Sequence, residues 1–223
     1  MLNLLTLHEL NILIMNELKQ LGVIPFDFNT LISVLGDYKS PKDKVLRLLE
    51  NKDIIRLKKG MYVVSPQIHN QTLSTELVAN LLYGPSYISF ESALSYYGII
   101  PERVYTVKSA TLKRSRNFSN SLGYFEYTQM EASYFSIGVT TKIINSKYPY
   151  LIASPEKALC DLIIATKGLR LQSLKSVKTF LEEDIRADFS LLDSLNWNIV
   201  KECMDTTQKK KKELMLLYNL FQK

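Results

Sequence analysis

The strongest constraint on the fold lies in the first 64 residues, where three segments with helical periodicity precede two short β-prone runs. Apolar residues at three- and four-residue spacing predict a helix over residues 7–21. Capping residues, a helix-starting proline and terminal glycines predict two further helices, at 27–36 and 41–51. The runs 54–57 and 61–64 flank a glycine-containing turn and predict a hairpin. This order of elements predicts a winged helix-turn-helix.

The sign of the charge changes along this segment. Residues 1–38 hold one basic and four acidic side chains, whereas residues 39–59 hold eight basic and three acidic ones. Lysine and arginine contact the phosphates of duplex DNA, and a helix in the major groove also reaches base edges. The candidate DNA-binding residues are Lys39, Lys42, Lys44, Arg47, Arg56, Lys58 and Lys59. One alternative stays open: the lysines form a solvated helix face, and the small domain contacts another protein.

The length of 223 residues favours two domains. We predict a winged helix DNA-binding domain over 1–66 and a second domain over 67–223. Strands are expected at 103–111 and 122–129, with two more between 138 and 153, and helices dominate from residue 154 onward. The predicted fold class is α+β: an N-terminal winged helix-turn-helix, then a mixed α/β C-terminal domain with antiparallel strands and a helical C-terminal end.

Composition argues against most catalytic and membrane classes. Two cysteines and two histidines are too few for a disulfide framework, a four-cysteine zinc site or most histidine-based chemistry. No phosphate-binding loop, dinucleotide-binding or hydrolase motif is present, so we expect no enzyme activity, no cofactor and no metal. No run approaches the roughly 18 apolar residues of a membrane span, and we expect no membrane partner and a cytoplasmic location.

A second basic cluster lies between the two expected strands at 103–111 and 122–129. Lys113, Arg114 and Arg116 fall in a predicted loop, where arginines can hold a phosphate through paired hydrogen bonds. They are a second candidate nucleic-acid contact. The alternative is an ordinary solvated hairpin loop.

Three strings in this chain carry a family resemblance through their order and spacing. They are Arg56-Leu57-Lys58-Lys59-Gly60-Met61-Tyr62-Val63, Tyr87-Ile88-Ser89-Phe90-Glu91-Ser92-Ala93-Leu94, and Ala153-Ser154-Pro155-Glu156-Lys157-Ala158-Leu159-Cys160-Asp161-Leu162. Together they resemble the AbiEi family, the antitoxins of bacterial type IV toxin-antitoxin systems in abortive phage infection. The resemblance covers most of the chain and weakens towards its end.

The resemblance implies a role for each domain. The N-terminal domain is expected to bind inverted repeats upstream of its own operon and repress it. The C-terminal domain is expected to counter a nucleotidyltransferase-like toxin without a stable complex. The resemblance also matches Lys113, Arg114 and Arg116 to a basic loop of the family's second domain. We expect a monomer in solution or a weak dimer on operator DNA.

Two other functions remain open from the sequence. The first is a DNA-binding transcriptional regulator whose second domain binds a small effector. The second is a nucleic-acid-modifying enzyme, which would have to turn over labelled nucleotides or RNA.

Overall fold

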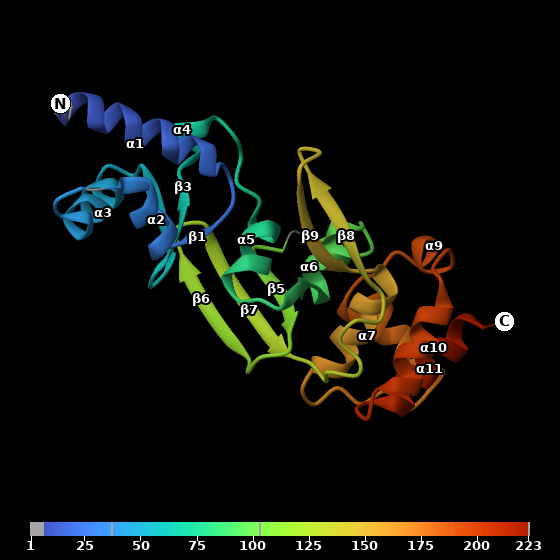
Figure 1. Ribbon diagram of the computed structural model, residues 1–223. Helices are drawn as coiled ribbons and strands as arrows, with labels where there is room; N and C mark the ends of the chain where they lie inside the picture. Colours follow the sequence, from blue (N-terminus) through green and yellow to red (C-terminus); the bar gives the residue numbers. More distant parts are fainter. Residues whose placement is uncertain (1–6, 37, 103, 223) are drawn as a thin grey trace. The chain divides into compact units, whose positions relative to one another are not determined.

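The chain folds into two compact units that together contain helices and β-sheets (Figure 1). The computed structural model describes residues 7–36, 38–102 and 104–222. The first unit runs to Val78 and includes the segment 119–122, and the second holds the rest. The division therefore falls later than residue 66, where the sequence placed it. The reason is that the short helix after residue 66 still packs on the first unit, with Ile68 against its core.

The first unit contains four helices and three short strands among the residues that the structure describes. Thr30 donates its backbone N–H to the Asp27 carboxylate at 2.8 Å, which caps the second helix and lowers the pKa of Asp27. The three predicted helices and the predicted hairpin are confirmed. The elements are α1 (Leu7–Leu21), β1 (Phe26–Asp27), α2 (Phe28–Leu35), α3 (Pro41–Glu50), β2 (Ile54–Lys58), β3 (Met61–Val64) and α4 (Pro66–His69).

The sequence did not predict β1, a strand of two residues. Phe26 pairs with Tyr62, so β1 extends the hairpin into an antiparallel sheet of order β1-β3-β2. A two-residue strand has no periodicity of its own, and its pairing depends on β3, which is distant in the chain.

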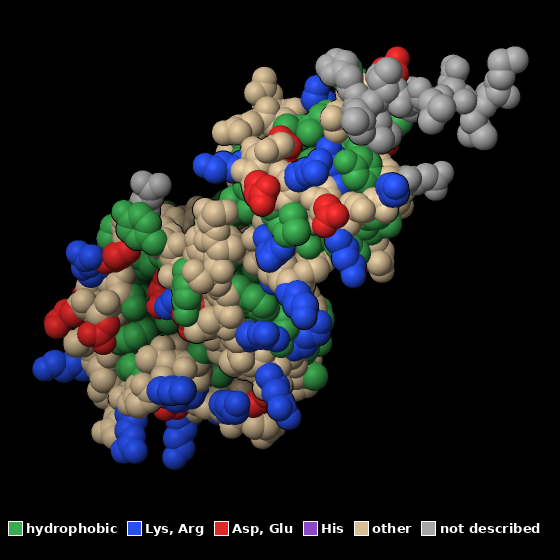
Figure 2. Space-filling model, turned by 90° about the vertical axis from the view of Figure 1, so that its left-hand side faces the viewer, with side chains coloured by type: hydrophobic (Ala, Val, Ile, Leu, Met, Phe, Trp, Pro, Cys, Tyr) green, Lys and Arg blue, Asp and Glu red, His purple; other side chains and the backbone are tan. Residues whose placement is uncertain are grey.

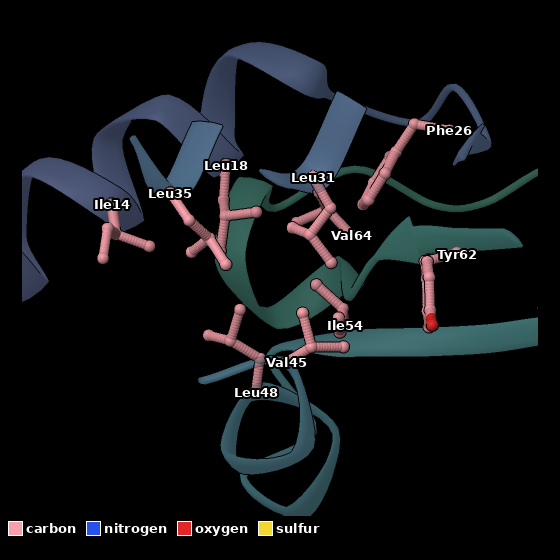
Figure 3. Packing of buried hydrophobic residues seen from close by; sticks show 10 residues of the cluster. All are labelled: Ile14, Leu18, Phe26, Leu31, Leu35, Val45, Leu48, Ile54, Tyr62 and Val64. Carbon is pink, nitrogen blue, oxygen red and sulfur yellow. The ribbon is translucent and has the colours of Figure 1, made fainter. Parts of the chain in front are cut away.

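One apolar cluster holds the first unit together. Ile14 and Leu18 of α1 face Leu31 and Leu35 of α2, and side chains of α3 and the sheet complete the core (Figure 3). Each such side chain, when fully buried, contributes about 1.5–3 kcal/mol relative to exposure. The ten labelled residues are Ile14, Leu18, Phe26, Leu31, Leu35, Val45, Leu48, Ile54, Tyr62 and Val64.

The second unit is built on a six-stranded sheet of order β6-β7-β5-β4-β9-β8. Strand β4 pairs antiparallel with β5 and parallel with β9, while β5 pairs parallel with β7. The sheet is therefore mixed: it contains the antiparallel strands that the sequence predicted, together with parallel pairs that the sequence did not predict. The strands are β4 (Ser86–Ile88), β5 (Thr106–Thr111), β6 (Arg116–Asn120), β7 (Gly123–Gln129), β8 (Val139–Ile144) and β9 (Tyr148–Ala153).

Strand β6 explains the difference. The sequence left residues 112–121 as a loop joining two strands, but β6 occupies part of this segment and pairs with β7. The chain thus reverses once more before β7, which can then run parallel to β5.

Helices pack around this sheet and form the C-terminal part of the second unit. Helix α6 contacts both β5 and α7, and α10 contacts α7 and α11. Trp197 stacks on Phe221 with ring centroids 4.1 Å apart, joining the last two helices. The helices are α5 (Thr75–Leu82), α6 (Phe90–Tyr96), α7 (Pro155–Ala165), α8 (Leu174–Thr179), α9 (Phe189–Leu192), α10 (Trp197–Thr206) and α11 (Lys211–Phe221), with a π-helical turn at Phe180–Asp184.

Candidate nucleic-acid interface

Helix α3 divides its side chains between the core and the surface. Val45 and Leu48 are buried in the apolar cluster, which fixes the rotation of the helix. Lys42 and Arg47 are exposed, and Lys39 is exposed in the segment before the helix. The structure therefore leaves three of the predicted cations on or beside α3 accessible to a polyanion.

Lys44 does not belong to this accessible set. Its side chain is only 8% exposed, and its Nζ donates to Asn11 Oδ1 of α1 at 2.6 Å. The ammonium also lies 5.8 Å from the centre of the Tyr38 ring. Burial lowers the pKa of Lys44, an effect that nearby Asp53 partly opposes. Lys44 thus joins α3 to α1, and the structure does not place it among the accessible cations that the sequence grouped it with.

The hairpin presents its cations unequally. Arg56 and Lys59 are exposed, whereas Lys58 is half-buried and engaged with another residue. Gly60 has a φ of +76°, and its carbonyl accepts the backbone N–H of Phe28 at 3.0 Å. That hydrogen bond fixes the turn against the start of α2, so Lys59 lies on an anchored turn. Strand β2, which carries Arg56, packs against α3.

The exposed face of α3 also carries acidic and apolar side chains. Asp43 and Glu50 are exposed on it, and Leu46 is exposed between them. Figure 2 shows basic side chains interspersed with acidic and apolar ones on one face of the molecule. The favourable field for DNA is therefore local to a few side chains and is not a continuous basic surface.

The second basic cluster lies on aromatic rings of the second unit. Lys113 Nζ is 5.2 Å from the centre of the Tyr83 ring, and the Arg116 guanidinium is 5.1 Å from that of Phe118. Tyr83 also donates its hydroxyl to the Arg114 carbonyl at 3.2 Å. All three cations are exposed, but Arg116 begins strand β6 and is not in a loop. These contacts orient the Lys113 and Arg116 stems while leaving charge accessible to solvent.

The second unit contains a buried ionic network that was not predicted from the sequence. Lys157 and Asp161 of α7 are fully buried, with Nζ and Oδ1 3.3 Å apart, and Lys157 also donates to the Tyr134 carbonyl at 2.8 Å. The other Asp161 oxygen accepts the hydroxyls of Ser89 at 2.6 Å and Tyr87 at 3.0 Å. Burial and the Asp161 charge raise the pKa of Tyr87, which keeps this donor protonated.

The sequence did contain a signal for this network. Two of the strings that carried the family resemblance, 87–94 and 153–162, meet in it through Ser89 and Asp161. A lysine and an aspartate four residues apart lie on one helix face, but spacing alone does not reveal that this face is buried.

No family model matches this chain, and no curated protein sequence matches it. Within residues 7–36, 38–102 and 104–222, no helix has the length and apolar character of a membrane span. Across the same described residues, no group of three or more His, Cys, Asp or Glu side chains could hold a metal ion.

Proposed function

We propose that this chain is a DNA-binding transcriptional repressor of its own operon, whose first unit is a winged helix-turn-helix. The order α1-β1-α2-α3-β2-β3, with a β1-β3-β2 sheet, supports this proposal. The observation that carries it is that Lys42 and Arg47 project from α3, while Arg56 and Lys59 are exposed on the hairpin of the same unit. In this proposal α3 enters the major groove, and the hairpin turn contacts the phosphates beside it.

We test this with the full chain and a fluorescent duplex containing the inverted repeats upstream of its gene. The triple variant K42A/R47A/K59A should lose operator binding in an anisotropy titration. The matched control K175A/K201A removes two exposed lysines of the second unit and should bind like the parent. Each phosphate contact removed should reduce the log-log salt slope by about 0.9. Unchanged binding by the triple variant would refute the proposed interface.

We further propose that the second unit acts as the antitoxin of a type IV toxin-antitoxin pair in phage defence. Its support is the resemblance of the three strings, two of which form the buried network of this unit. The expected partner is a nucleotidyltransferase-like toxin encoded beside this gene. Co-expression with that toxin should restore growth, and the DNA-binding triple variant should restore it equally. Failure of the parent chain to rescue growth would reject this role.

The second candidate function is a regulator whose second unit binds a small effector. A specific observation favours it: the second unit contains a solvent-open pocket lined by charged and apolar side chains, among them Glu91, Lys108 and Leu162.

A further inference from the structure

The β2-β3 hairpin contains a β-bulge next to its cationic turn. Arg56 pairs with Tyr62, and Lys58 pairs with Met61. In the β2-β3 register that the structure describes, Leu57 lies between these pairs and is not matched to a residue of β3. A bulge interrupts the ladder of backbone hydrogen bonds, bends the strand and changes the direction of neighbouring side chains. The conformation of this bulge therefore affects the direction of two cations, Arg56 and Lys58.

A residue from far along the chain bonds to the bulge. Asn120 Nδ2 donates to the Leu57 carbonyl at 3.1 Å. Oδ1 of the same amide accepts the backbone N–H of Leu122 at 2.9 Å, and this local bond leaves Nδ2 as the donor towards Leu57. Asn120 ends strand β6, and residues 119–122, which join β6 to β7, belong to the first unit. The bulge is thus fixed by the turn of the β6-β7 hairpin.

Two hydrogen bonds from outside the β2-β3 hairpin flank its cations. Phe28 donates its backbone N–H to the Gly60 carbonyl at 3.0 Å, and Asn120 donates to the Leu57 carbonyl. Residues 58–59, both lysines, lie between the two bonded carbonyls in the sequence. Ordering a mobile backbone on binding costs conformational entropy, and a backbone that is already fixed avoids this cost. The two bonds therefore prepare the hairpin for contact with a polyanion.

The β6-β7 hairpin is itself fixed within the second unit. Phe118, two residues before Asn120, packs on Tyr83 and Tyr127 with ring centroids 5.5 and 5.7 Å apart. Tyr127 of β7 also donates its hydroxyl to the Ala79 carbonyl at 2.7 Å. All four residues that make these contacts belong to the second unit. The hairpin thus has its strands anchored in the second unit, while its turn belongs to the first.

From this geometry we infer that Asn120 is a positioning residue for operator binding, through which the β6-β7 hairpin regulates the affinity of the β2-β3 hairpin for DNA. The inference deepens the proposed repressor function and rests on it. Asn120 does not contact DNA; it keeps the bulge and the turn that carries Lys59 in one conformation. Displacement of the β6-β7 turn therefore weakens operator binding without changing any residue at the DNA.

The first test measures the anchor in the full chain without DNA. N120A should speed amide hydrogen exchange in residues 57–62 by about three- to tenfold, because one hydrogen bond that opposes local opening is lost. F118L, which removes the ring that packs on Tyr83 and Tyr127, should speed exchange in the same segment. The matched control is N117A, an amide on the same strand that donates to the Tyr124 hydroxyl at 2.9 Å within the second unit. It should leave this exchange unchanged.

Unchanged exchange in either N120A or F118L would overturn the inference and leave the proposed repressor standing. Faster exchange in N117A equal to that in N120A would overturn it too, because the effect would then not be specific to the bond with Leu57.

The second test is a double-mutant cycle on operator binding, measured by anisotropy. N120A should weaken binding about three- to tenfold in the parent and in K42A. In K59A it should weaken binding less than about twofold, because its effect passes through the hairpin cation that is already missing. Equal weakening in K42A and K59A would overturn the inference, since a direct DNA contact or a general defect gives that result. A parent chain that does not bind the duplex would reject the repressor and this inference with it.

Discussion

At the scale of single residues, Lys42 and Lys44 lie in opposite environments although they are two positions apart. Lys42 is exposed, whereas Lys44 is buried and hydrogen-bonded to Asn11. Charge alone did not separate them in the sequence. The helical repeat could have done so, because position 44 lies one turn before the buried Leu48 and borders the apolar stripe.

This difference predicts that stability and DNA binding separate between the two lysines. K44M keeps the apolar stem but removes the hydrogen bond to Asn11, so it should reduce the free energy of unfolding by about 1–2 kcal/mol. Its operator affinity should stay within about twofold of the parent, because the missing charge does not reach the surface. K42A should show the reverse, with weaker operator binding and unchanged stability. Urea unfolding and anisotropy measure the two quantities, and a large loss of operator affinity in a folded K44M would contradict the assignment.

The lowered pKa of Lys44 also predicts a pH dependence. The unfolded chain, with an ordinary pKa near 10.5, holds the Lys44 proton more tightly than the folded chain. Between the folded and unfolded pKa values the unfolded state binds more protons, so this residue makes stability rise with pH in that window. Above neutrality, the unfolding free energy of the parent should therefore rise with pH relative to that of K44M, which lacks the titrating group. A difference that is constant up to pH 10.5 would contradict the shift.

At the scale of elements, local signals were sufficient for the helices and the hairpin of the first unit, but not for its strand β1 or for the sheet of the second unit. Helices α1, α2 and α3 and the β2-β3 hairpin have caps, apolar stripes and turn residues within their own segments. The mixed sheet depends on which strands pair across long stretches of chain, and sequence periodicity does not specify that choice. Strand β6 has a weak signal because its residues are mostly exposed and polar. The buried Lys157–Asp161 pair could not be predicted either, since only the tertiary fold shows that this face of α7 is buried.

The hairpin turn offers a prediction at this scale. Gly60 has a φ of +76°, and a Cβ added there would meet no atom within 4 Å. G60A should therefore destabilise the first unit through backbone strain alone, by about 1 kcal/mol. G60N is the matched control, because asparagine tolerates this conformation and should recover part of the loss. Urea unfolding followed by circular dichroism measures both variants, and equal stability of G60A and the parent would mean that the turn relaxes freely.

At the scale of the whole molecule, the buried ionic network and the proposed DNA contacts lie in different units of the chain. The Lys157–Asp161 network lies in the second unit, and the cations of α3 and the hairpin lie in the first. If each unit has its own core, a defect in the network should leave the first unit folded.

D161A tests this separation. It leaves Lys157 charged and buried without its partner, which should reduce the unfolding free energy of the second unit by about 3–5 kcal/mol. Calorimetry should then show two unfolding transitions. The transition of the second unit should move to lower temperature, and that of the first unit should not move. Operator binding below the first transition should match the parent. D205A, at an exposed position on α10, is the control. K157M/D161L should recover part of the lost stability, because neither buried charge remains although the Ser89 and Tyr87 hydroxyls lose their acceptor. A single transition that shifts together with a loss of operator binding would show that the units fold as one, and the network would then support DNA binding as well.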